Sequence, residues 1–433
     1  MSINQIIQYQ PIINIGCLGS VSDGKSTLVA KLTGIKTQRH SDELKRNITI
    51  NQGYGNLKIF QDGDEYHTTD NTELNKVTEL TELTEPTGLN EVTEQTNNNH
   101  LVNHISFVDC PGHQELIQTM LSSIVLMDGA IIVVAVNAPL SQKPQLIQHL
   151  AAAKLGKLGK IIVCMNKIDL VDKETLKERK QELDTMLSDY DIKPYAIIPT
   201  CFNKKIGIKH VVKAIMELFN PTDYINRLTN SPLFRISRSF DINKPGVGWN
   251  EVVGGVIGGS LFNGKLEIND KIEIRPGQIS KGKDGKYTCK PIITTVLSIK
   301  TDTTDLDKII PGGLIGIRTD LDPYYCKHNG LAGQVMGKIG TLPEIFTEIT
   351  LNISIITSFG FVWTPKVNEN MMLQIGTKMF EAKLTKINES SKNYTFTLTK
   401  PTCISDNEHI IICHNINKIL RIVGEGYPVL GLK

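Results

Sequence analysis

The chain has 433 residues, which is enough for two to four domains. Its composition, 40% hydrophobic and 21% charged, supports buried cores and excludes a wholly disordered protein. No apolar run approaches the length of a membrane span, and the N-terminus lacks the basic, apolar and small-residue order of a signal peptide. We therefore expect a protein that works in the cytoplasm and has no membrane partner.

The formal net charge of +2 is unevenly distributed along the chain. Residues 61–100 contain ten Asp or Glu and one Lys, so this segment carries −9 and the remainder carries +11. A basic body suits a polyanionic partner such as RNA. The eight cysteines are scattered without a C-x-x-C pair, which predicts reduced thiols and argues against a disulfide framework or a zinc site.

A phosphate-binding loop is the first motif along the chain. The strand-like run 12–19 leads into GSVSDGKS at 19–26, which matches G-x-x-x-x-G-K-[ST], and a helical pattern begins at Lys25. In such a loop, backbone N–H groups, the lysine and the hydroxyl hold phosphates and a metal ion. The motif predicts a bound nucleotide but does not identify its base.

Two further segments carry the residue types that a γ-phosphate site needs. The run RNITI offers the hydroxyl of Thr49 to Mg²⁺ when a nucleoside triphosphate is bound. The run FVDCPGH places Asp109 at a strand end, where it can hold Mg²⁺ through water, and the Gly112 amide can sense the γ-phosphate. His113 follows directly, where a group is needed to orient the attacking water.

An acidic, repetitive segment at about 61–100 interrupts this pattern. It repeats T-E-L imperfectly and ends in an asparagine run. Because it has few large apolar residues and no sustained period, it cannot bury enough surface to offset chain entropy. We expect a disordered surface insertion, and an acidic partner-binding segment is the alternative.

The run NKID at 166–169 follows a hydrophobic strand pattern. The carboxylate of Asp169 can accept hydrogen bonds from both N1–H and the 2-amino group of guanine, a donor pair that adenine lacks. Alone, N-K-x-D is also compatible with a solvated turn. Behind a phosphate loop it predicts guanine recognition, so the expected nucleotide is GTP.

Strand and helix patterns alternate up to about residue 220, which is typical of a mostly parallel sheet covered by helices on both faces. The strand candidates are the runs 12–19, 104–110, 128–137, 159–166 and 195–200, and the helix candidates include 25–34 and 173–190. Short glycine-punctuated strands follow and predict two small β-barrels. The expected division is a GTP-binding domain at 1–225, a first barrel at 226–338 and a second barrel at 339–433.

Taken in order, these motifs resemble those of translational GTPases. Longer phrases, among them HISFVDCPGHQELIQTMLSS, RSFDINKPG and RPGQISKGKDGKYTCKPI, are similar to the gamma subunit of eukaryotic and archaeal translation initiation factor 2. The similarity runs from about residue 11 to 425, apart from the insertion. It implies a GTPase domain and two β-barrels that carry initiator methionyl-tRNA to the small ribosomal subunit. It also implies alpha and beta partner subunits, a GTPase-activating factor and an exchange factor, with slow hydrolysis when the activating factor is absent.

The resemblance also assigns a nucleotide-binding set. That set is Ser22, Asp23, Gly24, Lys25, Ser26, Thr27, Gly112, Asn166, Lys167, Asp169, Cys201, Phe202 and Asn203. The implied cofactors are GTP or GDP and Mg²⁺, with Ser26, Thr49 and, through water, Asp109 as metal ligands.

The catalytic residue implied by the resemblance is His113, which would orient water behind an apolar gate of Val21 and Ile48. Tyr54 lies in the run GYGNLKIF, soon after RNITI, and is a candidate for stacking on the tRNA. The alternative is an edge-strand tyrosine that packs on its own domain.

Two departures from the family pattern affect these expectations. The second base-contacting turn reads Cys201-Phe202-Asn203 instead of S-A-x, and we expect the Phe202 amide to reach guanine O6. The cysteines of a zinc knuckle are absent after the first switch, so no zinc is expected. Two alternative functions stay open: an elongation-type aminoacyl-tRNA carrier, and a scaffold that binds GTP without hydrolysing it.

Overall fold

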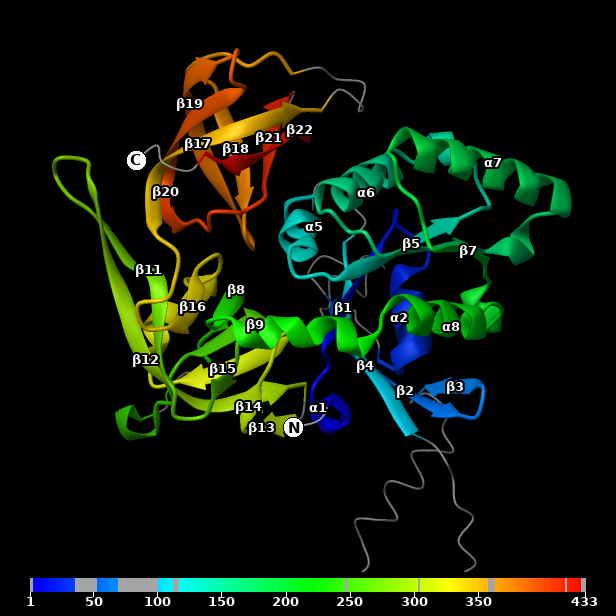
Figure 1. Ribbon diagram of the computed structural model, residues 1–433, viewed down its shortest axis with the longest axis horizontal. Coiled ribbons are helices and arrows are strands. Elements are labelled where there is room, and N and C mark those ends of the chain that lie inside the picture. Colours follow the sequence, from blue (N-terminus) through cyan, green and yellow to red (C-terminus); the bar gives the residue numbers. More distant parts are fainter. Residues whose placement is uncertain are drawn as a thin grey trace, which may run out of the picture.

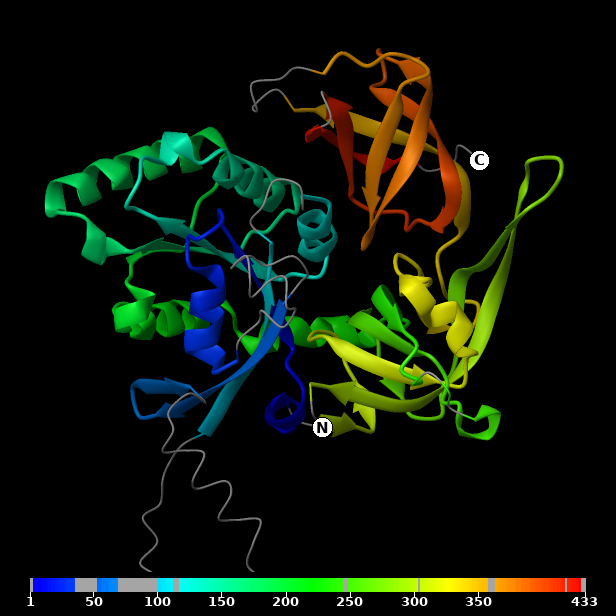
Figure 2. The same cartoon turned by 180° about the vertical axis from the view of Figure 1, so that it is seen from behind.

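The computed structural model describes residues 3–35, 53–68, 100–111, 117–244, 246, 248–302, 304–356, 363–416 and 419–429. In Figures 1 and 2 an α/β unit lies beside two all-β units, and the second all-β unit, coloured orange to red, lies above the first. Among the described residues, no helix is long and apolar enough to cross a membrane. All eight cysteines lie in the described ranges as free thiols, and seven of them are buried.

The α/β unit is built on a sheet with the strand order β3-β2-β4-β1-β5-β6-β7. Its strands are β1 (Ile13–Leu18), β2 (Gly53–Asp62), β3 (Glu65–Thr68), β4 (His100–Asp109), β5 (Gly129–Ala135), β6 (Ile161–Asn166) and β7 (Ala196–Pro199). Strands β4, β1, β5, β6 and β7 pair in parallel, whereas β2 and β3 add an antiparallel edge. Every residue of β1, β5 and β6 is buried, as expected of strands covered on both faces. The predicted mostly parallel sheet is confirmed.

Helices cover both faces of this sheet. They are α1 (Ile3–Tyr9), α2 (Lys25–Thr33), α5 (Ile117–Ile124), α6 (Pro144–Leu155), α7 (Lys173–Asp189) and α8 (Ile208–Leu218). Apolar side chains of α5, α6 and α7 form one core cluster with the sheet, and those of α1, α2 and α8 form another. Local chemistry fixes several helix starts: the Asp172 carboxylate accepts the Thr175 N–H to cap α7, and Pro144 opens α6.

The first part of the acidic segment is folded, and the prediction of disorder from residue 61 onward is wrong there. Strands β2 and β3 form an antiparallel hairpin around Gly63, whose φ is +58°. The hairpin is anchored because Ile59 is fully buried and Tyr66 packs against the same core cluster. The Asp62-Gly63 pair is a hairpin turn signal. The low-complexity composition that predicts disorder belongs to the residues after this hairpin. Residues 69–99 lie outside the described residues.

Two closed β-barrels follow the α/β unit, as predicted. In the first, β8 (Leu233–Phe240), β9 (Val256–Asn263), β11 (Lys271–Lys281), β12 (Tyr287–Thr301), β15 (Ile315–Thr319) and β16 (Val335–Lys338) close through the pairing of β11 with β12. The short strands β10 (Leu266–Glu267), β13 (Thr304–Leu306) and β14 (Lys308–Ile309) attach to this barrel region. The second barrel consists of β17 (Ile345–Ile355), β18 (Asn370–Ile375), β19 (Lys378–Asn388), β20 (Asn393–Cys403), β21 (Ile410–Ile416) and β22 (Ile419–Pro428). Closure satisfies backbone groups that an open sheet edge would leave unpaired.

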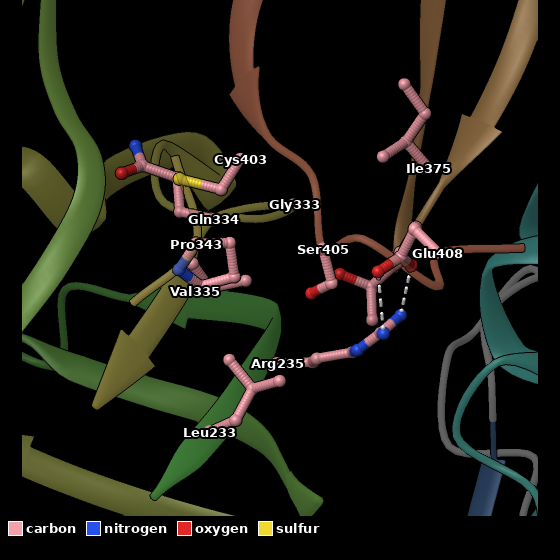
Figure 3. Close-up of a pocket in the computed structure, with 12 residues that line it drawn as sticks. Leu233, Arg235, Gly333, Gln334, Val335, Pro343, Ile375, Cys403, Ser405 and Glu408 are labelled. Carbon is pink, nitrogen blue, oxygen red and sulfur yellow. Dashed lines mark hydrogen bonds and ion pairs between the residues drawn. The ribbon is translucent and has the colours of Figure 1, made fainter. Parts of the chain in front are cut away.

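A buried ion pair joins the two barrels (Figure 3). Arg235 of the first barrel donates two parallel hydrogen bonds, of 2.8 and 3.0 Å, to the carboxylate of Glu408. The two side chains are only 14% and 7% exposed. The pocket beside them holds about 10 Å³, roughly the room of one water molecule. The barrels are therefore closely packed here and leave no ligand cavity at this pocket.

The α/β unit contacts both barrels. The side-chain amide of Gln10 donates to the carbonyls of Ile310 (2.7 Å) and Gly312 (3.0 Å) in the first barrel. Apolar residues of the second barrel join the core cluster that contains α5, and Lys157 lies 4.4 Å from the ring centre of Tyr427. A conformational change in the α/β unit would therefore alter contacts with both barrels.

Candidate nucleotide site

The sheet topology brings the predicted motifs to one edge. The phosphate loop follows β1, Asp109 ends β4, Asn166 ends β6, and Cys201 follows β7. Because these strands are parallel, their carboxyl ends lie at the same edge of the sheet, and Asp109 is paired directly with Cys17 of β1. Segments separated by more than a hundred residues therefore meet around a single site.

The backbone of the phosphate loop requires its glycines. Gly19 and Gly24 have φ values of +136° and +109°, in the region that favours glycine. A Cβ atom on Gly19 would lie 2.1 Å from the Val133 carbonyl oxygen, and one on Gly24 would lie 2.4 Å from the side-chain nitrogen of Asn166. Helix α2 begins at the next residue, so its free N–H groups and dipole face the loop. This is a ready-made phosphate cradle.

Lys25 and a histidine that sequence reasoning missed support the loop from inside. The Lys25 ammonium donates to the carbonyls of Gly19 (2.9 Å) and Ser20 (2.8 Å), and burial lowers its pKa while Asp109 and Asp23 oppose that shift. The Gly19 N–H donates to Nδ1 of His149, 3.1 Å away, on helix α6. Burial lowers the pKa of His149 to about 3, so the imidazole is neutral and can accept this bond.

The metal-binding expectation fits the donors that the structure places together. The Ser26 hydroxyl donates to Oδ2 of Asp109 at 2.6 Å, and Asp109 is fully buried. A hydroxyl and a carboxylate are the hard oxygen donors that Mg²⁺ prefers beside phosphate oxygens. These two residues would hold the ion. The third predicted ligand, Thr49, lies outside the described residues.

Asn166 links the phosphate loop to the turn after β7, which is predicted to contact the base. Its Nδ2 donates to the carbonyl of Asp23 at 2.8 Å, and its Oδ1 accepts the Phe202 N–H at 3.2 Å. The backbone N–H of Phe202 is expected to donate to guanine O6. In the structure that N–H already donates to Asn166, so a bond to guanine would compete with this one. The Phe202 ring is buried under the loop, near Gly24, and the next residue, Asn203, is exposed.

Asp169, the predicted guanine reader, lies at the surface beside two donors. The Lys204 ammonium lies 3.2 Å from its carboxylate, and the side chains of Cys201 and Lys204 both lower the pKa of Asp169. The side chain therefore stays ionised, in the form that accepts two hydrogen bonds. Lys167 is half-buried, and its backbone adopts a left-handed conformation with a φ of +65°. Cys201 thus favours the ionised form of Asp169 although it departs from the family serine.

Of the other predicted site residues, some lie in or next to the phosphate loop and some lie outside the described residues. Ser22 is exposed at the loop tip with a φ of +63°, and Val21 and Thr27 are half-buried. Four predicted residues lie outside the described residues, namely Ile48, Thr49, Gly112 and His113.

Tyr54 is half-buried on β2, and β3 pairs only with the far end of that strand, at residues 59–62, so β2 has an open outer side at Tyr54. Its ring packs against the core cluster of α5 and lies 5.4 Å from the guanidinium carbon of Arg238 in the first barrel. Burial raises its pKa to about 12. The residue therefore forms a contact between the α/β unit and the first barrel.

Comparisons with known protein families cover most of the chain. Residues 10–221 match the elongation factor Tu GTP binding domain, residues 254–335 match elongation factor Tu domain 2, and residues 350–427 match the initiation factor eIF2 gamma C-terminal family. Together these matches follow the α/β unit and the two barrels in order.

Similar solved structures support the fold alone. A bacterial selenocysteine-specific elongation factor EF-Sec superposes with a TM-score of 0.71 at 20% identity, over 98% of this chain and 59% of that one. Elongation factor SelB from Methanococcus maripaludis, in complex with the GTP analogue GPPNHP, gives 0.69 at 18% identity, over 97% and 79%.

Two curated relatives narrow the family. The "Eukaryotic translation initiation factor 2 subunit gamma" of Encephalitozoon cuniculi is 37% identical over 98% of this chain and 93% of its own length. The protein of the same name from Schizosaccharomyces pombe is 35% identical over 98% and 95%. With the phosphate-loop motif and both barrels in place, the chain belongs to the gamma-subunit family of translation initiation factor 2, a family of GTP-binding translation factors.

Proposed function

We propose that this chain binds initiator methionyl-tRNA when GTP is bound, delivers it to the small ribosomal subunit in the cytoplasm, and uses GTP hydrolysis as the release step. Family membership supports the general role in translation initiation. The more specific proposal rests on one contact, that of Tyr54 with Arg238. This contact links a strand that closely follows the first switch to the first barrel.

The first barrel offers a surface suited to a nucleic-acid end next to that contact. Arg238 and Phe240 lie on one side of β8, and both Phe240 (41%) and Ile242 (53%) are exposed. A shallow pocket beside Phe240 is also lined by Lys327 and His328, which are both exposed. Aromatic faces stack on unpaired bases, and cations pair with backbone phosphates. The surface can therefore recognise the single-stranded end of a tRNA.

Coupling between nucleotide and tRNA follows from this arrangement. With GTP bound, Thr49 and Gly112 would be drawn toward the γ-phosphate, which would order the segment leading into β2 and set the position of Tyr54. When bound, Mg²⁺ would neutralise phosphate charge between Ser26 and Asp109. His113 would orient the attacking water, with Val21 and Ile48 shielding it, and a GTPase-activating factor would accelerate this slow step.

The proposal includes a heterotrimer with alpha and beta subunits and an exchange factor that restores GTP. The test is a filter-binding titration of initiator Met-tRNA against the purified chain with a non-hydrolysable GTP analogue and with GDP. We expect tighter binding in the GTP state by about 5–150-fold, the range of a typical allosteric coupling. Binding should also weaken as the salt concentration rises. The reason is that lysine and arginine side chains that neutralise tRNA phosphates release bound counterions, and added salt opposes this release.

Elongator Met-tRNA serves as the matched ligand in that experiment. Equal affinity for elongator and initiator Met-tRNA would favour an elongation-type carrier. Indistinguishable affinities in the two nucleotide states would instead favour a scaffold that binds GTP without acting as a switch.

A further inference from the structure

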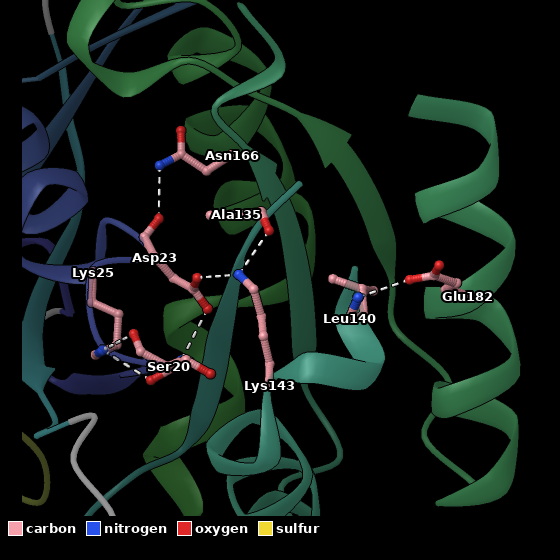
Figure 4. Close-up of polar contacts among 9 residues, drawn as sticks. Ser20, Asp23, Lys25, Ala135, Leu140, Lys143, Asn166 and Glu182 are labelled. Atoms are coloured by element: carbon pink, nitrogen blue, oxygen red, sulfur yellow. Dashed lines mark hydrogen bonds and ion pairs between the residues drawn. The ribbon is translucent and has the colours of Figure 1, made fainter. Parts of the chain in front are cut away.

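A second lysine, which no motif predicted, contacts the phosphate loop (Figure 4). Lys143 lies between the short helix η2 (Leu140–Gln142) and α6, and its ammonium is 2.5 Å from Oδ1 of Asp23. It also donates to the carbonyl of Ala135, at the end of β5, at 2.7 Å. The Lys143 and Asp23 side chains are only 12% and 2% exposed. A buried ion pair of this kind becomes costly when one partner is removed, because the other charge stays buried and unpaired.

Asp23 connects several parts of the nucleotide site. Its Oδ2 accepts the Ser20 N–H at 3.0 Å, and its backbone carbonyl accepts the side-chain amide of Asn166 at 2.8 Å. The same residue therefore fixes the start of the phosphate loop and joins it to the base-binding turn. However, its negative charge lies in a loop that must receive a polyphosphate, and the Lys143 ammonium neutralises that charge.

The surface helix α7 fixes the backbone of Lys143 through Leu140. The Leu140 N–H donates to Oε2 of Glu182 on α7 at 2.8 Å, and the Lys143 N–H donates to the Leu140 carbonyl at 3.0 Å. Leu140 is fully buried in the core cluster that contains α7. The connection between β5 and α6 is thus fixed on one side by α7 and reaches the phosphate loop on the other.

We propose that Lys143 is a positioning residue for the nucleotide, and that it slows nucleotide release by holding Asp23 and cancelling its charge. The inference rests on GTP binding by this family and does not depend on the proposed tRNA carrier role. Lys143 acts through Asp23, so it should affect nucleotide affinity and leave the hydrolysis rate at saturating GTP almost unchanged.

The test is the release rate of a fluorescent GDP from the full chain, chased with excess GDP. Lys143→Met should accelerate release by about tenfold or more, because it leaves the Asp23 carboxylate buried, unpaired and close to phosphate. Lys143→Arg should restore slow release, since a guanidinium can still pair with the carboxylate. The matched control is Lys154→Met in the last turn of α6, whose pair with Asp191 is exposed (46% and 72%) and should not affect release.

If Lys143→Met folds poorly, a double-mutant cycle with Asp23→Asn tests the same interaction. In an Asp23→Asn background no buried charge needs neutralising, so Lys143→Met should then change the release rate by less than about twofold. Slow release from a folded Lys143→Met variant, or an equal acceleration in the Asp23→Asn background, would overturn the proposal. An equal effect of Lys154→Met would do the same.

Discussion

The ammonium of Lys204 lies 3.2 Å from the carboxylate of Asp169, and the two residues follow different strands of the same sheet, β7 and β6. Cys201 and Lys204 lower the pKa of Asp169, so its carboxylate stays ionised at the surface. An acceptor held in this way matches the two donors of guanine, N1–H and the 2-amino group. The relationship predicts which base the protein selects.

Asp169→Asn should reverse base selection. The amide can donate to the 2-oxo group of xanthine but cannot accept both guanine donors, so the variant should bind xanthosine triphosphate in preference to GTP. The loss of GTP affinity should be about tenfold or more, as for a lost charge-assisted pair. Competition binding with both nucleotides measures the preference. A variant that still prefers GTP would show that another residue reads the base.

His113→Ala should separate catalysis from binding. The imidazole is expected to act on the attacking water, so GTP affinity should stay nearly unchanged while factor-stimulated hydrolysis falls by on the order of 10²-fold or more. Single-turnover hydrolysis with the ribosome and the activating factor present provides the measurement. Equal rates in variant and parent would exclude this role for His113.

Arg235→Met should destabilise the junction between the barrels by about 3–5 kcal/mol, because Glu408 would remain buried without its partner. The double variant Arg235→Met/Glu408→Leu should recover most of this loss, since no buried charge remains. Thermal unfolding of the full chain compares the three proteins. Lys180→Met, which breaks an exposed pair with Asp184, is the control and should change stability by less than about 1 kcal/mol. If the single and double variants melt alike, the ion pair does not dominate the junction.

Buried His149 should make stability depend on pH below neutrality. Its folded-state pKa is lowered to about 3, whereas an unfolded histidine has a pKa of roughly 6.5. Between these values the unfolded chain binds more protons, so stability rises with pH and falls as the solution is acidified from about 6.5 toward 3. Each pH unit within this window costs up to about 1.4 kcal/mol for this one group.

Urea unfolding at several pH values from 7.5 to 4.5 tests this dependence on His149. His149→Gln keeps an acceptor for the Gly19 N–H and removes the titrating ring, so its stability should decline less steeply than that of the parent. His210→Gln, at an exposed position of α8, is the matched control and should follow the parent. Parallel pH curves for the parent and His149→Gln would contradict the assignment.

Motifs that lie in one continuous stretch were predictable from the sequence. Gly19, Gly24, Lys25 and Ser26 are close neighbours in the chain, so local turn geometry and a helix start place them almost without help from the rest of the fold. The strands of the parallel sheet were also predictable, since strands buried on both faces read as continuous apolar runs such as β5 and β6. Nucleotide class and domain order followed from these local signals.

Only the tertiary structure decided which distant side chains support those motifs. Lys143 reaches Asp23 across 120 residues, and His149 reaches Gly19 across 130, although nothing in their local sequence distinguishes them from an ordinary surface lysine and core histidine. Arg235 and Glu408 meet only because two separate barrels pack together. The physical reason is that such pairings depend on which surfaces the folded units bury against each other, and periodicity within one segment carries no information about its partner.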